Sequence, residues 1–295
     1  MKFKLRRYYL YYFGRALAFL FCLLPIQVGI RIGSELGKLA FYILPRYRRS
    51  TLDNLRKYLD GERTERELKD IAKNVFSNMG KNAAELVNFP KIDAANIDRF
   101  VTIRNPEVME DAFKKGKGII LLTAHFGNWE LLAATLRIKN YPGATIGRKI
   151  YFKLYDEYLN YLRKTHDVNV IYRDASPKGM LKVLKRNEIM GILADQDVDS
   201  VEGVFVNFFG HPAYTPIGPV ALAKATGASI IPAFIVRDNG RHDLIIEKPI
   251  ELVDTGDKEK DVVINTQKWS DVVESYIRKY PDHWVWMHKR WKTKV

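Results

Sequence analysis

The spacing of apolar residues along the chain changes near residue 100. Over 32–90 they recur at helical spacing, with one apolar stripe in 36–43 and another in 68–79. Pro45 and the Asp60-Gly61 turn interrupt this region. A period of three to four residues, broken by proline and glycine, predicts a series of helices.

From about residue 101 short apolar runs of strand length alternate with helical stretches. The alternation predicts an α/β core with a largely parallel central sheet flanked by helices. No internal repeat or low-complexity linker is apparent, so we expect one domain over 32–295, with a helical leader to about 100. The expected strands are 118–124, 144–147, 168–172, 189–194, 229–236 and 243–247, and the expected helices are 106–115, 128–139, 152–165, 177–187, 217–226 and 262–279.

Residues 1–31 have the pattern of a membrane-associated segment. Basic residues and a cluster of tyrosines precede Ala16–Ile30, which carries no charge and is shorter than the roughly 20 residues that span a bilayer. Basic residues flank it on both sides, which favours an anchor or interfacial helix on the cytoplasmic face over a segment that crosses. No clean cleavage site for a signal peptide follows it. A buried core helix is the alternative.

The composition adds a strong positive charge. The 295 residues carry 48 Lys and Arg against 34 Asp and Glu, a formal net charge of +14. Such an excess predicts an acidic partner, which is nucleic acid, an anionic membrane surface, or an acidic protein or substrate. The single cysteine, Cys22, excludes an internal disulfide framework and a thiolate zinc cluster.

The segment 118–130 contains the most informative chemistry. Its apolar run ends at His125, Gly127-Asn128 marks a turn, and a helical pattern with Glu130 in its first turn follows. His125 is therefore expected at the end of a buried strand, with Glu130 one helical turn away and close enough to reach the ring. This arrangement suits a general base held by a carboxylate. A buried histidine satisfied by a local acid is the alternative.

Several other mechanisms lack their motifs. The chain has no Gly-x-Ser-x-Gly elbow, no phosphate-binding glycine loop with Lys-Ser/Thr and no His-Glu-x-x-His helix. The other five histidines are scattered without metal-ligand spacing, so no metal is expected. No serine or cysteine nucleophile lies beside His125. A base at this position therefore takes its proton directly from a substrate hydroxyl.

Charged residues also occur where other strands are expected to end. Arg148 follows one strand, Asp195 and Asp197 follow another, and Arg163 lies on a helix between them. Singly, each is more simply a solvated charge or a structural ion pair. Together they suit the binding of an anionic headgroup or the orientation of the histidine loop.

Two aromatic segments have open interpretations. Residues 204–210 form either a wall of an acyl pocket or an ordinary strand and turn. The tail 282–292 combines three tryptophans with cations, as in nucleic-acid stacking, a membrane interface or plain packing. No nucleic-acid-binding motif accompanies it, so no nucleic-acid partner is expected.

Taken together, the motifs resemble the bacterial late acyltransferases of lipid A biosynthesis, the lauroyl and myristoyl transferase type. The similarity runs through most of the chain in order, and the Gly-Asn-Trp-Glu continuation after His125 is more specific than the histidine and acid alone. Glutamate in place of aspartate, and the lack of a Phe-Pro-Glu-Gly element, favour the lipid A branch over the glycerol-phosphate acyltransferases. The matching segments are the basic apolar leader, 124–130, Arg148, 194–197, 206–210, 214–216, 225–228 and 284–292.

The resemblance implies a transferase without a cofactor. His125 is then the base and Glu130 orients it, while Asn128, Arg148, Arg163 and Asp195 bind substrate or support the site. The donor is an acyl carrier protein thioester or acyl-coenzyme A, and the acceptor is a lipid A precursor, another glycolipid or a lysophospholipid. The expected location is the cytoplasmic face of the bacterial inner membrane. The non-enzymatic alternative is a basic peripheral membrane protein in which His125 and Glu130 are structural.

Overall fold

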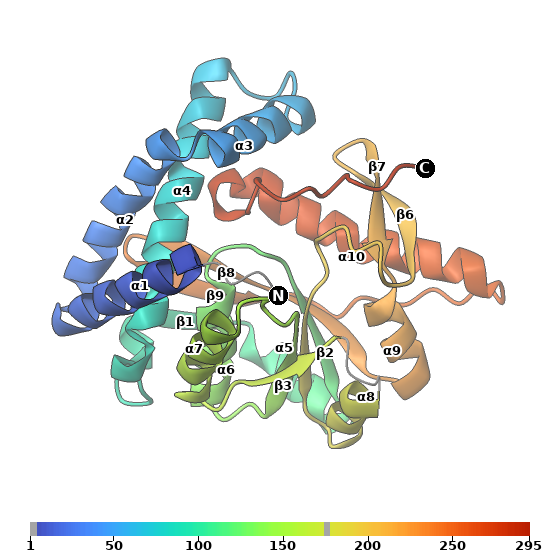
Figure 1. Cartoon of the computed structure of the whole chain (residues 1–295). Coiled ribbons are helices and arrows are strands. Elements are labelled where there is room, and N and C mark those ends of the chain that lie inside the picture. The colour runs from blue at the N-terminus through green and yellow to red at the C-terminus, as the bar shows by residue number, and fades with distance from the viewer. Residues whose placement is uncertain (1–4, 174–177) are drawn as a thin grey trace.

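The computed structural model describes residues 5–173 and 178–295, and its first part is helical. Figure 1 shows these helices gathered on one side of the molecule, with α2 and α4 crossing each other. Thr64 caps α4 through a capping box with Glu67, and Pro45 occupies the first turn of α3. The helices are α1 (Leu5–Leu23), α2 (Ile26–Ile43), α3 (Pro45–Tyr58) and α4 (Glu65–Val87).

The α2–α4 crossing depends on glycine. A Cβ at Gly33 would lie 2.5 Å from the Gly80 carbonyl oxygen, and a Cβ at Gly37 or Gly80 would overlap the opposite backbone still more. The two helix backbones therefore approach closely only because these three positions lack side chains. The crossing fixes α2 against α4, and α4 reaches the centre of the molecule.

A seven-stranded sheet forms the core, in the order β1-β9-β8-β2-β5-β3-β4. All neighbouring strands are parallel except β8 and β9, which form an antiparallel pair. Every residue of β2 is buried, as expected of a central parallel strand covered on both faces. The strands are β1 (Val101–Arg104), β2 (Ile119–Thr123), β3 (Gly143–Gly147), β4 (Asn169–Tyr172), β5 (Ile189–Leu193), β8 (Ser229–Asp238) and β9 (Arg241–Ile246).

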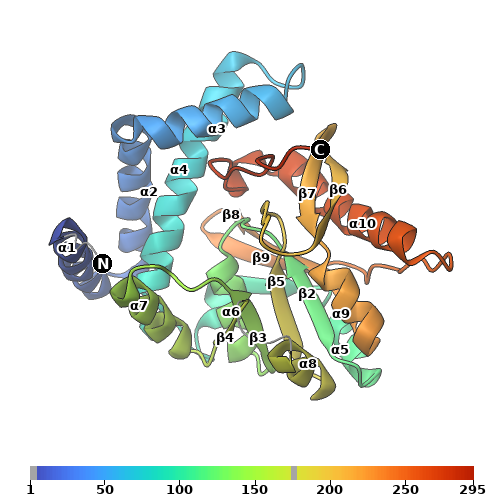
Figure 2. The same cartoon turned by 45° about the vertical axis from the view of Figure 1, so that its right-hand side comes forward.

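Helices cover both faces of this sheet (Figure 2). Ile119 and Leu121 of β2 pack with α5 and α6, whereas Ile120 and Leu122 pack with α8, α9 and α10. The alternation follows from the two-residue period of a strand. The helices of the second part are α5 (Pro106–Lys114), α6 (Trp129–Ile138), α7 (Lys153–Lys164), α8 (Lys178–Lys185), α9 (Gly218–Thr226) and α10 (Lys258–Lys279).

The strands β6 (Gly203–Phe208) and β7 (His211–Pro216) form a separate antiparallel hairpin. The C-terminal tail packs against it. Trp284 and Trp286 are buried, and Trp291 stacks on Tyr58 of α3 with ring centroids 3.4 Å apart. Residues 204–210 therefore form a strand and turn, which is one of the two interpretations left open by the sequence. The tryptophans of the tail serve packing.

The α/β prediction with a largely parallel sheet is confirmed, and each of the six expected strands is present within two residues. The short strand β1 was not predicted. The apolar stretch within 1–31 is divided, because the chain turns at Leu24-Pro25 between α1 and α2. Among the helices described, none is both long and apolar enough to cross a bilayer. The basic residues before Leu5 and position 177 of the expected helix 177–187 lie outside the described residues.

Candidate active site

His125 and Asp195 are brought together by the register of two neighbouring strands. Strands β2 and β5 are parallel and adjacent, and Thr123 pairs with Leu193 at their carboxyl ends. His125 and Asp195 each lie two residues beyond the end of their strand. Equal extensions from paired residues bring the two side chains to the same edge of the sheet, where sites of parallel sheets collect.

The Asp195 carboxylate is buried, and both of its oxygens accept hydrogen bonds. One oxygen, Oδ1, lies 2.8 Å from Nδ1 of the His125 ring. The other, Oδ2, accepts the backbone N–H of His125 at 3.0 Å and the indole N–H of Trp284 at 2.8 Å. The ring of His125 is still partly exposed, with 23% of its side-chain surface accessible, so its free edge can meet a substrate.

Charge and hydrogen bonding define the state of this pair. Burial alone would raise the pKa of Asp195, but His125, His288 and the Trp284 N–H hold that pKa well below its usual range. An ionised Asp195 accepts hydrogen bonds only, so Nδ1 of His125 carries a proton, and in the neutral ring Nε2 is the nitrogen with the lone pair. This is the tautomer that a general base needs.

The loop after His125 is fastened on several sides. Gly127 donates its N–H to the carbonyl of His283 at 2.8 Å, and its own carbonyl accepts Asn82 Nδ2 at 2.6 Å. Gly127 has φ +57°, and a Cβ there would overlap the Ile235 carbonyl, so only glycine fits. Val285 N–H completes the attachment at the His125 carbonyl, 3.1 Å away.

Asn128 and Glu85 form the buried support of this loop. Asn128 caps α6 by accepting the Leu131 N–H at 3.1 Å and donates to Glu85 Oε2 at 2.7 Å. Arg237 binds the Glu85 carboxylate with two N–H groups, and His242 Nε2 lies 3.0 Å from it. Burial raises the pKa of Glu85, but His242 and Arg237 outweigh burial and the net shift is downward. Asn128 thus links the loop after His125 to the buried Glu85 cluster.

Within the described residues, no hydrogen bond joins Glu130 to the His125 ring. Its carboxylate is held by Arg163 on α7, with N···O distances of 2.8 and 2.5 Å. Burial lowers the pKa of Arg163, yet the bonds to Glu130 raise it more, and the net shift is upward. The expected contact of Glu130 with the ring is therefore corrected: Asp195, from the neighbouring strand, occupies that place. Whether Glu130 acts in catalysis stays a prediction.

The remaining charged residues separate into two kinds. Arg148 is exposed at the end of β3 and forms no ion pair with any described residue. Asp197, in contrast, accepts the N–H and the hydroxyl of Thr293 at 2.7 and 2.8 Å and thereby ties down the tail. Arg148 is free to meet an anionic substrate, whereas Asp197 is structural.

The structure adds His288 to the site. His125, Asp195 and His288 form a group whose ligand atoms all lie within 4.8 Å of one another, which is a donor set that a transition metal can use. Asp195 Oδ1 is already bonded to His125 Nδ1, so a metal bound by these two atoms would replace their hydrogen bond. Spacing along the chain gave no signal for His288, because 163 residues separate it from His125.

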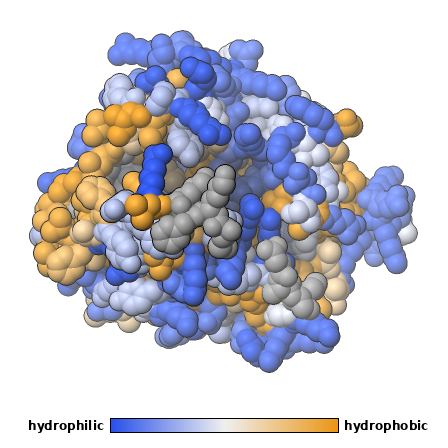
Figure 3. Space-filling model, in the orientation of Figure 1, coloured by the Kyte–Doolittle hydropathy of each residue, from blue (hydrophilic) through white to orange (hydrophobic). Residues whose placement is uncertain are grey.

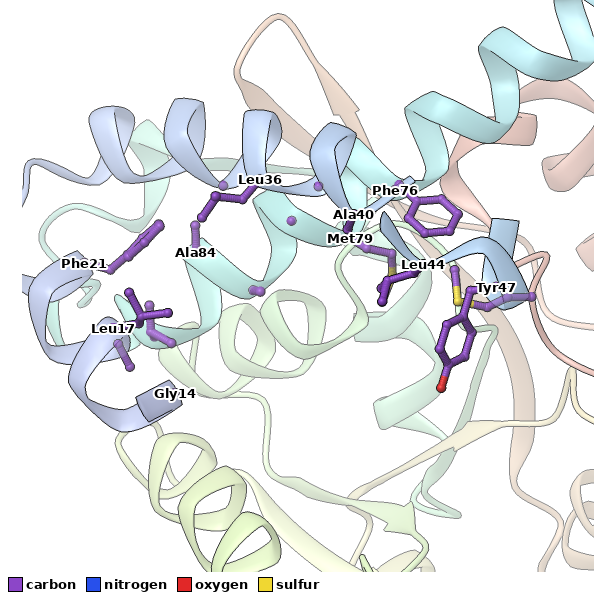
Figure 4. Close-up of a pocket in the computed structure, with 17 residues that line it drawn as sticks. Gly14, Leu17, Phe21, Leu36, Ala40, Leu44, Tyr47, Phe76, Met79 and Ala84 are labelled. Carbon is purple, nitrogen blue, oxygen red and sulfur yellow. The ribbon is translucent and has the colours of Figure 1, made fainter. Parts of the chain in front are cut away.

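An apolar groove of about 510 Å³ lies between α1, α2 and α4 (Figure 4). Leu17 and Phe21 line it from α1, Leu36 from α2, and Met79 from α4. Met287 of the C-terminal tail, which precedes His288 in the sequence, also lines the groove. The tail thus contributes residues both to the groove and to the histidine site.

The described chain thus has a largely parallel sheet with a histidine–carboxylate pair at its edge, together with an apolar groove between the first helices, an arrangement suited to an enzyme. The sequence model of the family described as bacterial lipid A biosynthesis acyltransferase matches residues 1–293, and the chain belongs to this family. It is an O-acyltransferase.

Three curated relatives show the range of the similarity. The lipid A biosynthesis lauroyltransferase of Escherichia coli is 29% identical over 98% of this chain and 93% of its own length. The lipid A biosynthesis palmitoleoyltransferase of the same organism is 23% identical over 98% and 92%. The phosphatidylinositol mannoside acyltransferase of Mycobacterium tuberculosis is 24% identical over 73% and 68%.

Proposed function

We propose that the protein transfers a fatty acyl chain from an acyl carrier protein thioester to a hydroxyl of a lipid A precursor at the cytoplasmic face of the bacterial inner membrane. The observation that supports this most is the His125–Asp195 pair, in which Asp195 binds Nδ1 and leaves Nε2 as the ring's base. The similarity to lipid A acyltransferases supports the choice of acceptor.

The His125–Asp195 pair supports direct transfer, with no covalent enzyme intermediate. His125 Nε2 takes the proton of the acceptor hydroxyl while the oxygen attacks the thioester carbon. Asp195 stabilises the imidazolium that forms and keeps the ring in one orientation. The imidazolium then returns the proton to the departing thiolate. The chain's own residues supply base and orientation, and no cofactor is required.

The charge of the protein suits both proposed partners. Acyl carrier proteins are acidic, and the net charge of +14 favours association with an acidic protein and with an anionic membrane. Arg163 is already neutralised by Glu130, whereas Arg148 is exposed and unpaired within the described chain. We assign to Arg148 a phosphate of the donor or of the acceptor headgroup.

The membrane contact is assigned to α1 and α2. Most of the large apolar side chains that are exposed in the described residues lie between Leu5 and Tyr47. Figure 3 shows hydrophobic residues gathered on the side of the molecule where these helices lie. Arg7 and Arg15 lie over the rings of Tyr151 and Tyr158, a combination typical of the headgroup layer. A patch of this kind suits helices that lie in the interface rather than cross it.

The groove between α1, α2 and α4 is assigned to an acyl chain of the lipid substrate. Its lining is apolar and includes Met287, the residue before His288. A chain entering from the membrane along α1 and α2 would then reach the histidines without passing through water.

The direct test measures labelled acyl transfer from an acyl carrier protein thioester to a lipid A precursor. Replacing His125→Ala should lower kcat by about 10³-fold, because the base is lost. His211→Ala, at a histidine of the β6–β7 hairpin, is the matched control and should retain activity. Equal activity of the His125→Ala protein would contradict the mechanism.

The acceptor is tested by mass spectrometry of lipids from cells that lack the gene. A lipid A that misses one secondary acyl chain supports the proposal. Intact lipid A together with an altered mannoside or phospholipid would direct the proposal to another acceptor, such as the one named for the mycobacterial relative. Transfer from acyl-coenzyme A, measured in parallel, identifies the donor.

A further inference from the structure

The side chain of Gln196 lies between the two histidine rings of the site. Its amide nitrogen, Nε2, is 3.0 Å from His288 Nδ1 and 3.2 Å from His125 Nε2. The second nitrogens of the same rings are 3.3 and 3.2 Å from it. The rings meet edge to face, with centroids 5.0 Å apart, and the amide nitrogen occupies the notch between them.

Chemistry fixes the direction of these hydrogen bonds. Because Asp195 accepts the Nδ1 proton of His125, the Nε2 lone pair of that ring can only accept. Burial, followed by the charge of His125, lowers the pKa of His288 to about 4, so this ring is neutral at pH 7 and also accepts. The amide NH2 of Gln196 has two N–H groups, and one serves each ring.

The acceptor hydroxyl must bind at the Nε2 lone pair of His125, beside the Gln196 amide, whose nitrogen is 3.2 Å from both nitrogens of the ring. When the hydroxyl binds His125 Nε2, it displaces one N–H of the amide while the other stays on His288. The displaced N–H then lies about 3 Å from the base that activates the hydroxyl, with no other acceptor assigned to it. A neutral donor this close to the attacking oxygen is suited to meet the charge that develops on the neighbouring carbonyl oxygen.

We propose that Gln196 is a further catalytic residue, whose amide N–H donates to the oxyanion of the tetrahedral intermediate, and that His288 is the positioning residue that holds this amide. The inference rests on the proposed acyl transfer. It assigns to both residues a role in stabilising charge rather than in moving protons.

The step balances as follows. The hydroxyl proton moves to His125 Nε2, the C–O bond forms, and the carbonyl π pair moves onto its oxygen, which accepts the Gln196 N–H. Collapse restores the carbonyl and breaks the C–S bond. The thiolate takes the proton from His125 Nε2, so that ester, thiol and neutral histidine remain. Gln196 neither gains nor loses a proton.

The test replaces the donor and keeps its size. Gln196→Met is similar in length and has no N–H, and Gln196→Glu is isosteric and cannot donate when ionised. Both should lower kcat by about 10²- to 10³-fold with little change in KM, as loss of one oxyanion donor does. Gln267→Met, at a half-buried glutamine bonded to Asn207 and Asp271, is the control and should match the wild-type rate.

Variants of His288 test the positioning role. His288→Phe should lower kcat to a similar extent, whereas His288→Asn offers a side-chain oxygen to the amide and should recover most of the rate. The double variant Gln196→Met/His288→Phe should be no slower than Gln196→Met alone, because both changes remove the same interaction. Additive losses would overturn the assignment of His288.

The outcomes separate the two proposals. If the wild-type enzyme transfers acyl chains and the Gln196→Met variant is as fast or faster, this inference alone is overturned. The amide would then only block access to the base. A folded wild-type protein that transfers nothing from carrier-protein or coenzyme A thioesters overturns the proposed function and this inference with it.

Discussion

Asp195 binds His125 at two points, through the ring Nδ1 at 2.8 Å and through the backbone N–H at 3.0 Å. The first bond sets the tautomer and direction of the ring. The second fixes the chain end that carries the ring, and Trp284 holds the same carboxylate from the tail. One carboxylate therefore aligns strand β2, strand β5 and the C-terminus around a single base.

Asp195→Asn should leave this geometry largely intact and remove its charge. The amide can present its N–H to Nδ1 and so reverse the tautomer, and we expect kcat to fall by about 10³- to 10⁴-fold. Acyl transfer under saturating donor measures the loss. Asp197→Asn, on the same loop but bonded to Thr293, is the control. A control that loses as much activity would show that the loop, rather than the charge, is responsible.

Glu130→Gln should impair the enzyme less than Asp195→Asn does. The change leaves Arg163, whose side chain is 19% exposed, without its carboxylate partner. We expect the free energy of unfolding to fall by about 1–3 kcal/mol, below the value for a fully buried pair, and kcat to fall by about tenfold. Urea unfolding and kinetics with Glu130→Gln, Arg163→Met and the double variant complete the cycle. If activity falls as far as in Asp195→Asn while stability is unchanged, Glu130 acts on the base directly.

His288 should make the stability depend on pH. In the unfolded chain a histidine titrates near pH ~6.5, whereas burial holds the pKa of His288 in the folded chain at about 4. Between these values the unfolded state binds a proton that the folded state does not, so the free energy of unfolding falls as the pH is lowered from 6.5 to 4.

His288→Asn removes this proton. The slope of unfolding free energy against pH should then be shallower than in the wild type by up to about 1.4 kcal/mol per pH unit. Urea titrations at pH 7.5, 6 and 5 provide the comparison, and the effect of His288 should vanish at pH 7.5. Parallel slopes for the two proteins would contradict the burial of a neutral His288.

Gly80→Ala should weaken the α2–α4 crossing. The added methyl group overlaps the Gly33 carbonyl, and we expect a loss of about 1–3 kcal/mol in the free energy of unfolding. Gly14→Ala is the matched control, because nothing lies within 4 Å of a Cβ at that helical position. Alanine is the better helix former there, so the control should be neutral or slightly stabilising.

Polar residues on the exposed face of α1 should release the protein from membranes. The triple variant Phe13→Ser/Phe19→Ser/Leu20→Ser removes three large side chains that are more than half exposed. Cosedimentation with vesicles that contain anionic lipid should fall at least tenfold, since each apolar side chain contributes about 1.5–3 kcal/mol when buried. Val201→Ser/Val263→Ser changes exposed valines elsewhere and should bind as the wild type does. If the wild type, the triple variant and the valine variant bind vesicles equally, the membrane contact lies outside α1.

The periodicity of the sequence was sufficient for six of the seven strands of the sheet and for His125 at a strand end. It was not sufficient for the partner of His125. Glu130 is near in sequence, but Asp195 is near in space because β5 pairs with β2, and strand order depends on long-range packing that no local pattern encodes. His288 illustrates the same limit, since the tail reaches the site only after the sheet is complete. The edge strand β1, Val-Thr-Ile-Arg, has only two apolar residues and gives no apolar run.

Helix α4 touches the apolar groove on one side and the histidine loop on the other. Gly80 lies at the crossing with α2, and Glu85, five residues later, supports Asn128. Five residues of helix span about 7.5 Å. On a lipid surface that receives α1 and α2, α4 is a rigid spacer of fixed length, and the height of the base above the bilayer is set by the chain itself rather than by the substrate.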